Sequence, residues 1–170
     1  PVSLYAASKR ADELMAYTYA YLYRIPTTGL RFFTVYGPWG RPDMAYFSFA
    51  DAIARGKKIQ VYNKGNQSRD FTYIADVVEG LRRVIEAPIA AEPGSVPNKV
   101  YNIGRGAPVQ LMEFIRELEE ALGSTVPKDY VAPQPGDVTD TWADCTALER
   151  DFGYHPTVEL REGIAEFVDW

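Results

Sequence analysis

Apolar residues recur with helical spacing in some stretches of the chain and form short continuous runs in others. Residues 3–23 show the helical spacing and predict a long helix, with Ser3 at the position of an N-cap. A second apolar face, which includes Tyr17 and Tyr21, predicts that this helix packs against two neighbours. Residues 27–36 form a nearly continuous run of β-branched and aromatic residues, which is typical of a buried parallel strand.

The rest of the chain continues this alternation. Further helices are predicted at 44–55, 75–86, 109–122, 145–151 and 160–169, and further strands at 59–62, 69–73, 100–103 and 128–131. Segments rich in Gly and Pro predict loops at 37–42, 87–99, 104–108 and 133–137. The alternation indicates an α/β fold, with too few strands for a complete doubly wound sheet.

Composition narrows the function classes. The 170 residues are 46% hydrophobic and 24% charged, which is ordinary for a soluble globular protein. The net charge of −5 argues against nucleic acid or an anionic membrane as a partner. The single cysteine, Cys145, cannot form an internal disulfide, and the single histidine, His155, offers no zinc cluster. No stretch approaches the ~20 apolar residues that span a bilayer. We therefore expect a cytoplasmic protein, with Cys145 packed against a helix and His155 on the surface.

Tyr5 and Lys9 lie four residues apart at the start of the first predicted helix, so their side chains share one face. A lysine ammonium beside a phenol favours the phenolate, which moves the tyrosine pKa towards the range of a general base. The pair suits proton transfer to or from a sugar or alcohol hydroxyl. The spacing alone is weak evidence, because such pairs arise by chance and more often reflect a core Tyr5 and a solvent-exposed Lys9.

Several short motifs occur in a characteristic order. They are Tyr5-Ala-Ala-Ser-Lys9, Leu30-Arg-Phe-Phe-Thr-Val-Tyr-Gly-Pro38, Ser68-Arg-Asp-Phe-Thr-Tyr-Ile-Ala-Asp-Val-Val78, Tyr101-Asn-Ile-Gly104, Gln134-Pro-Gly-Asp-Val138 and Trp142-Ala-Asp144. The chain resembles the C-terminal half of an extended short-chain dehydrogenase/reductase of the nucleotide-sugar epimerase/dehydratase group. Within the group, Thr34 and the run Gly37-Pro-Trp-Gly-Arg-Pro-Asp-Met44 are most similar to UDP-glucuronate 4-epimerases.

The resemblance implies part of a Rossmann-type parallel sheet plus a smaller α/β substrate-binding domain. Residues 1–40 would complete an NAD-binding domain, and residues 41–170 would mainly bind the nucleotide sugar, with a strand near 100–104 returning to the Rossmann sheet. The glycine-rich dinucleotide fingerprint that the family carries upstream is not in this sequence. We therefore expect this half alone to bind NAD poorly and to be inactive.

The resemblance also assigns roles at the reacting end of the site. Tyr5 would be the general base at the sugar O4, Lys9 would bind the nicotinamide ribose of NAD, and the Phe32 backbone would approach the nicotinamide. The implied reaction is epimerisation of UDP-glucuronate to UDP-galacturonate through a 4-keto sugar. Thr34 would contact the sugar, and Arg41 would hold the carboxylate unless it is simply a solvated loop arginine.

The nucleotide end is assigned in the same way. Arg69 would bind the diphosphate, unless it forms a structural ion pair with Asp70. Asp137 would accept the uridine ribose hydroxyls, and Gln60 and Tyr62 would border the uracil. Gln134 stands where many galactose-type epimerases have a phosphate-binding arginine, so Arg69 would carry more of the phosphate charge. Asp76 and Asp144 are expected to be helix caps or first-turn acids.

Other functions remain compatible with the sequence. Two other enzymes, a nucleotide-sugar 4,6-dehydratase and a UDP-glucuronate decarboxylase, would use the same scaffold. A second alternative is a protein of this fold that binds nucleotides without catalysing a reaction. The partner implied by the resemblance is a UDP-sugar, with no nucleic acid and no membrane. A homodimer through the 3–23 helix is expected, because the family commonly pairs this helix.

Overall fold

Helices and strands alternate along the chain in the computed structural model, which describes residues 1–87, 92–133 and 136–170. In chain order the elements are α1 (Leu4–Tyr23), β1 (Thr27–Phe32), β2 (Thr34–Tyr36), α2 (Ala45–Ala54), β3 (Ile59–Tyr62), η1 (Asn63–Gly65), β4 (Ser68–Arg69), β5 (Phe71–Tyr73), α3 (Ile74–Glu86), β6 (Asn98–Ile103), β7 (Val109–Gln110), α4 (Leu111–Leu122), β8 (Lys128–Val131), α5 (Thr146–Phe152) and α6 (Leu160–Asp169). The predicted α/β class and most of the predicted elements are confirmed.

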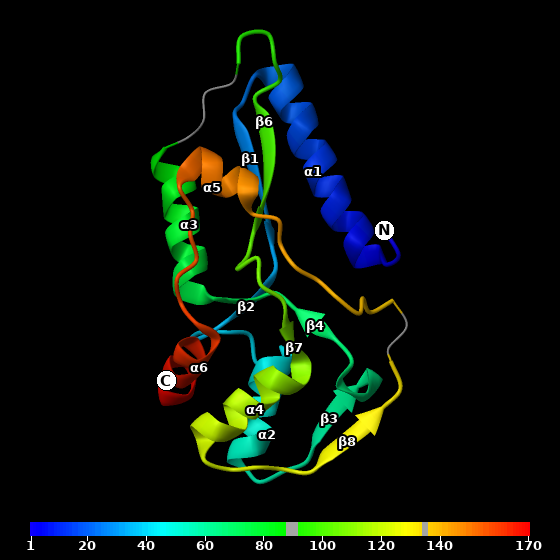
Figure 1. Cartoon of the computed structure of the whole chain (residues 1–170). Helices are drawn as coiled ribbons and strands as arrows, with labels where there is room; N and C mark the ends of the chain where they lie inside the picture. Colours follow the sequence, from blue (N-terminus) through cyan, green and yellow to red (C-terminus); the bar gives the residue numbers. More distant parts are fainter. Residues whose placement is uncertain (88–91, 134–135) are drawn as a thin grey trace.

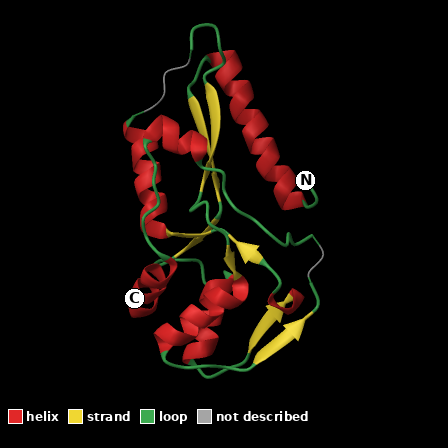
Figure 2. Cartoon of the chain, in the orientation of Figure 1, coloured by secondary structure: helices red, strands yellow, loops and turns green. Residues whose placement is uncertain are grey.

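The strands pair across long stretches of sequence. β1 pairs with β6, β2 with β5 and β3 with β8, all parallel, while the short β4 and β7 pair antiparallel. In Figures 1 and 2 the β1–β6 pair stands in the upper part of the molecule, and the β3–β8 pair lies at the lower edge beside α2 and α4. The molecule therefore has an upper part, built around β1 and β6, and a lower part, which contains α2, α4, β3 and β8. The short strands β2, β4, β5 and β7 lie between these two parts (Figure 1).

Three predicted elements differ from the structure. The strand predicted at 27–36 divides at Phe33, where the backbone leaves β6 and turns to β5. The amide of Phe33 still donates to the Ile103 carbonyl (3.2 Å), whereas the next amide, that of Thr34, donates to the Asp70 carbonyl (3.0 Å). The strand predicted at 69–73 divides at Asp70 in the same way. Residues 109–110, predicted as helix, form β7, because they pair with β4.

Helix α1 lies along one side of the β1–β6 pair, with α3 and α5 on the other side (Figure 1). The predicted Ser3 cap is confirmed, since its hydroxyl accepts from the Ala6 amide at 3.1 Å. Glu13 fastens the helix to β1 by accepting two hydrogen bonds from Arg31, at 2.6 and 2.8 Å. These bonds lower the pKa of Glu13 to about 2. On the face predicted for a second packing neighbour, Tyr17 and Tyr21 are 48% and 61% exposed within this chain, so that neighbour stays a prediction.

Two hydrophobic clusters hold the layers together. The lower cluster joins α2, α4 and α6 to β2 and β5, and its centre is aromatic. The Phe71 and Phe114 rings stack with centroids 4.0 Å apart, and the edge of Tyr36 packs against both. The upper cluster packs α3 and α5 on β6 through Val77, Ile103 and Leu148. Cys145 packs against this upper cluster, as predicted.

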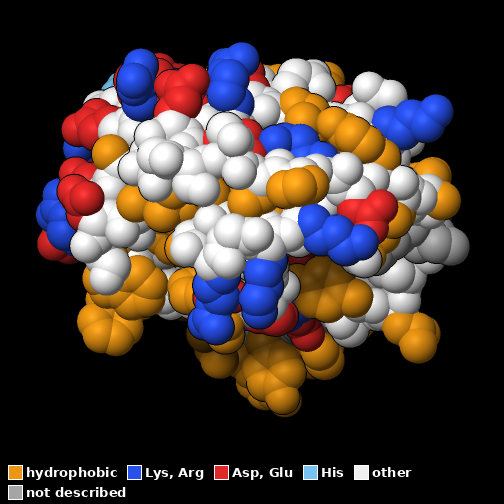
Figure 3. Space-filling view, turned by 90° about the horizontal axis from the view of Figure 1, so that it is seen from below, with side chains coloured by type: hydrophobic (Ala, Val, Ile, Leu, Met, Phe, Trp, Pro, Cys, Tyr) orange, Lys and Arg blue, Asp and Glu red, His pale blue; other side chains and the backbone are white. Residues whose placement is uncertain are grey.

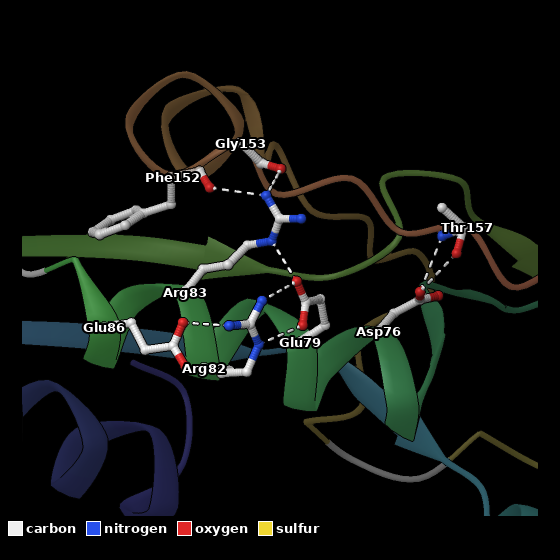
Figure 4. Close-up of polar contacts among 8 residues, drawn as sticks. All are labelled: Asp76, Glu79, Arg82, Arg83, Glu86, Phe152, Gly153 and Thr157. Carbon is white, nitrogen blue, oxygen red and sulfur yellow. Dashed lines mark hydrogen bonds and ion pairs between the residues drawn. The ribbon is translucent and has the colours of Figure 1, made fainter.

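Polar contacts fasten α3 to the C-terminal part of the chain (Figure 4). Asp76, in the first turn of α3 as predicted, accepts from the backbone amides of Thr157 (3.0 Å) and Val158 (3.1 Å). Arg83, two turns further along, donates to the Gly153 carbonyl at 2.6 Å. The segment between α5 and α6 is therefore held at both ends of α3.

On the lower face, basic and acidic side chains are interspersed, with apolar side chains between them (Figure 3). Exposed ion pairs of the chain include Arg55 with Asp51 and Lys58 with Asp129. His155 is exposed beside Glu149, as predicted for a surface histidine. In the described ranges, no helix is both long and apolar enough to cross a membrane.

Candidate functional site

A cavity of about 690 Å³ lies between α2, β3, β4 and the segment around residue 137. Its lining includes five of the residues predicted to bind substrate: Thr34, Gln60, Tyr62, Arg69 and Asp137. These residues come from four separate parts of the sequence. The fold therefore brings the predicted substrate-binding residues together, with Met44, Phe49 and Leu111 supplying apolar wall.

A second cavity, about 600 Å³ in volume, lies between α1 and β1 and contains Tyr5, Lys9 and Phe32. The Lys9 ammonium is 5.8 Å from the centroid of the Tyr5 ring and also pairs with Asp12 at 3.3 Å. Tyr5 is 73% exposed, so the alternative of a core tyrosine is wrong. The helix places a phenol and an amine side by side at an open surface, as the i, i+4 spacing predicted.

The chain passes from the lining of one cavity to the lining of the other at the break between β1 and β2. Phe32 lines the smaller cavity and Thr34, two residues later, lines the larger one. Arg41, also predicted to bind the sugar, lines neither cavity, although Asp43, two residues later, lines the larger one. The pKa of Arg41 is raised, first by a hydrogen bond from the guanidinium to Asp43. A ligand that occupies both cavities would therefore pass Thr34.

Arg41 is held by its own loop. Its Nε donates to Asp43 Oδ1 at 3.1 Å and its Nη2 donates to Asp43 Oδ2 at 2.6 Å, with both side chains exposed. The loop backbone packs tightly below, because a Cβ at Gly40 would lie 1.9 Å from the Tyr46 hydroxyl oxygen. Asp43 lines the larger cavity although the sequence did not single it out.

Arg69 is largely buried and engaged on several sides. Its Nη1 donates to the carbonyls of Ser68 (2.9 Å) and Thr139 (2.8 Å), and its Nη2 donates to Asp137 Oδ1 at 2.8 Å. Arg69 thus forms an ion pair within the protein, but its carboxylate partner is Asp137 and not the neighbouring Asp70. The predicted phosphate ligand and the predicted ribose ligand are thus in contact with each other. Gln134, assigned beside them, lies outside the described residues.

Asp70 is a buried carboxylate that the sequence analysis treated only as a neighbour of Arg69. Its side chain is fully buried and accepts from the backbone amides of Arg105, Gly106 and Ala143, each at 2.8 Å, and from the Thr72 hydroxyl at 2.9 Å. Four donors satisfy the charge without a basic side chain. Asp70 therefore fixes two segments, the turn that follows β6 and the loop that precedes α5. Its neighbours Arg69 and Phe71 line the larger cavity.

Asp144 has the capping role that was predicted for it. Its Oδ1 accepts from the Thr146 amide at 3.0 Å, at the start of α5. Burial raises the pKa of the neighbouring Cys145 thiol to about 11, so this cysteine stays protonated at neutral pH. Neither residue lines the two cavities described above.

Comparison with known proteins identifies the family. The parallel strands are those of a Rossmann-type α/β protein. The structure superimposes with a TM-score of 0.91 on a UDP-glucuronic acid 4-epimerase from Bacillus cereus that was solved with UDP-glucuronic acid and NAD. The two sequences are 32% identical, and the superposition covers 99% of this chain and 52% of that one. A family model, the NAD dependent epimerase/dehydratase family, matches residues 1–104. The chain belongs to this family.

Curated relatives agree with the match. The chain is 51% identical to Protein CapI of Staphylococcus aureus and 47% identical to a probable UDP-glucuronate 4-epimerase of Rhizobium meliloti. Both alignments cover 100% of this chain, but 54% and 53% of those proteins. The chain thus spans about half the length of the curated relatives it matches.

Proposed function

We propose that the full-length protein containing this chain is an NAD-dependent epimerase that inverts C4 of a UDP-sugar, converting UDP-glucuronate to UDP-galacturonate. The observation that carries the proposal is the gathering of Thr34, Gln60, Tyr62, Arg69 and Asp137 in one cavity, with Tyr5, Lys9 and Phe32 in the next. The relatives named as UDP-glucuronate 4-epimerases support the choice of sugar.

In this proposal the residues divide the ligand between them. Gln60 and Tyr62 border the uracil, Asp137 accepts from the ribose hydroxyls, and Arg69 binds the diphosphate. Thr34 donates to the sugar, and Arg41 presents its guanidinium to the C6 carboxylate. Of the two arginines only Arg69 is largely buried, so it contributes the stronger charge interaction.

The Tyr5 oxygen, in its phenolate form, accepts the proton from the sugar O4 to become a phenol, and it returns that proton when the hydride is given back to C4. The Lys9 ammonium, 5.8 Å from the centroid of the Tyr5 ring, binds the nicotinamide ribose hydroxyls. The residues around the smaller cavity also fit a dinucleotide, since Tyr5 and Lys9 present exposed donors beside the apolar Phe32 side chain. The chemistry that NAD supplies when bound is reversible acceptance of the hydride from the sugar carbon.

The reaction is tested by incubating the full-length protein with UDP-glucuronate and NAD and following the sugar signals by NMR. We expect UDP-galacturonate to accumulate to an equilibrium mixture that is also reached from UDP-galacturonate. A UDP-pentose product would show a decarboxylase, and a 4-keto product lacking the elements of water would show a dehydratase. No conversion, together with binding of UDP-glucuronate, would support the non-catalytic alternative and reject the proposal.

A further inference from the structure

Gln67 lies between Arg69 and Asp137 and has no role in the assignments above. The three side chains line the same cavity, and Gln67 is 9% exposed. Its Nε2 donates to Asp137 Oδ2 at 3.2 Å, while the other carboxylate oxygen, Oδ1, accepts from Arg69 Nη2 at 2.8 Å. Its Oε1 accepts from the same Arg69 nitrogen at 3.5 Å, which is long for a hydrogen bond. One amide group thus contacts both members of the ion pair.

The backbone of Gln67 is itself held in place. Its amide donates to the Gly65 carbonyl at 2.8 Å, and its carbonyl accepts from the Leu111 amide at 2.9 Å, at the start of α4. The preceding turn is compact, since Asn63, Lys64 and Gly65 all have positive φ angles. A side chain that begins from a backbone fastened on both sides loses little further entropy when it is ordered. Gln67 is therefore suited to orient the two groups that it touches.

We infer that Gln67 is a positioning residue for the nucleoside-diphosphate end of the cavity. It holds one oxygen of Asp137 and thereby fixes the plane of that carboxylate, so that Asp137 faces the ribose hydroxyls while Arg69 remains directed at the diphosphate. Without this hold the Asp137 carboxylate would have to be ordered by the ligand, at a cost in affinity. The inference rests on the proposed binding of a UDP-sugar.

The test exchanges donor and acceptor across the Gln67–Asp137 bond. Gln67→Glu in the full-length protein places a second carboxylate against Asp137, and we expect UDP to bind about tenfold more weakly in calorimetric titrations, the loss of roughly one charged hydrogen bond. Adding Asp137→Asn restores the net charge and lets the new amide donate to the carboxylate at position 67. We expect this double variant to recover part of the UDP affinity that Gln67→Glu loses, because the amide oxygen at position 137 can still accept from the ribose hydroxyls.

Asp140 provides the matched control for charge. It lies three residues after Asp137 and pairs with the Ser68 hydroxyl instead of Gln67. The variant Gln67→Glu with Asp140→Asn has the same net charge as the rescued variant but no exchanged bond, so we expect it to stay close to Gln67→Glu alone. Equal recovery in both double variants would overturn the inference, because charge alone would then explain it.

A second measurement covers variants that fold poorly. Gln67→Met keeps the side-chain length and removes the amide, and we expect KM for the UDP-sugar to rise about threefold to tenfold with kcat nearly unchanged. Unchanged UDP affinity in Gln67→Met would also overturn the inference. Failure of the wild-type protein to bind UDP would instead reject the proposed function, and the positioning role with it.

Discussion

At the residue scale, both arginines proposed to contact the ligand already hold an aspartate. Arg41 donates twice to Asp43, and Arg69 donates to Asp137. Asp43 and Asp137 both line the larger cavity. An anionic ligand must therefore share each guanidinium with a carboxylate or displace it. The exposed Arg41–Asp43 pair is the easier one to displace, since exposed ion pairs contribute only about 0–1 kcal/mol.

Tyr5 is expected to act in the chemical step and not in binding. Tyr5→Phe in the full-length protein should lower kcat at least ~10²-fold while leaving the dissociation constant of UDP-glucuronate nearly unchanged. Turnover is measured by NMR and binding by calorimetry. Tyr17→Phe, the same change on the same helix outside the two cavities, is the control. Near-normal turnover of Tyr5→Phe would remove Tyr5 from the mechanism.

Arg41 is expected to select for the acidic sugar. Arg41→Ala should weaken UDP-glucuronate more than UDP-glucose, because only the first offers a carboxylate to the guanidinium. We expect a ratio of about tenfold, the value of one charge-assisted hydrogen bond. Competition titrations measure both ligands, and Arg55→Ala, an exposed arginine outside the two cavities, is the control. Equal weakening of the two ligands would discard the carboxylate role.

At the element scale, the sequence predicted most helices and strands, and it missed the places where strands change partner. Residues 27–36 form a nearly continuous run of β-branched and aromatic residues, so the pattern contains no sign that Phe33 separates two pairings. The division at Asp70 arises because β4 pairs with β7 and β5 pairs with β2, and the sequence does not show these pairings. Motifs identified Tyr5, Lys9, Arg69 and Asp137, whereas Gln67 could not be found, because its role depends on a contact across 70 residues.

Asp70 is expected to stabilise the junction of these strands. Asp70→Asn should lower the free energy of unfolding of the full-length protein by about 2–4 kcal/mol, since an amide nitrogen would face backbone donors that now have an acceptor. Urea unfolding followed by tryptophan fluorescence measures the change. Asp12→Asn, at an exposed position on α1, should have little effect. Equal stabilities of the two variants would contradict this role.

At the scale of the whole molecule, burial raises the pKa of five tyrosines, and this makes the fold sensitive to alkali. The five are Tyr36, Tyr46, Tyr73, Tyr101 and Tyr154. For Tyr73 the pKa rises to about 12, through burial first and then through its hydrogen bond to Glu166. In the unfolded chain a tyrosine titrates near ~10.

The free energy of unfolding depends on pH because the folded and unfolded chains hold the Tyr73 proton with different pKa values. Between about pH 10 and 12 the unfolded chain has lost the Tyr73 proton while the folded chain keeps it, so stability falls as the pH rises. Below pH ~10 the contribution is fully present. Urea unfolding at pH 8 and pH 11 should show a smaller loss for Tyr73→Phe than for the wild type. Identical losses would show that Tyr73 titrates alike in both states.

The exposed apolar face of α1 leads to a prediction about assembly. Leu14, Tyr17 and Tyr21 are each about half exposed or more, and an apolar stripe of this kind is typical of a helix that pairs with another. We expect the full-length protein to be a homodimer and Tyr17→Glu with Tyr21→Glu to make it monomeric in light-scattering measurements. Tyr130→Glu, at another exposed tyrosine, should leave the mass unchanged. A monomeric wild type would contradict the prediction.

The hydrogen-bond partners of Asp70 have a consequence for folding during synthesis, because they lie far downstream in the chain. The carboxylate receives amides from residues 105, 106 and 143, and β3 finds its partner only in residues 128–131. Because a ribosome delivers the chain from its N-terminus, the early strands emerge long before these partners exist. The α2–α4 part of the molecule therefore cannot complete its strand pairing until nearly all of this chain has been synthesised. During this interval the edges of the early strands are unpaired, and a chaperone that covers them would be of most use.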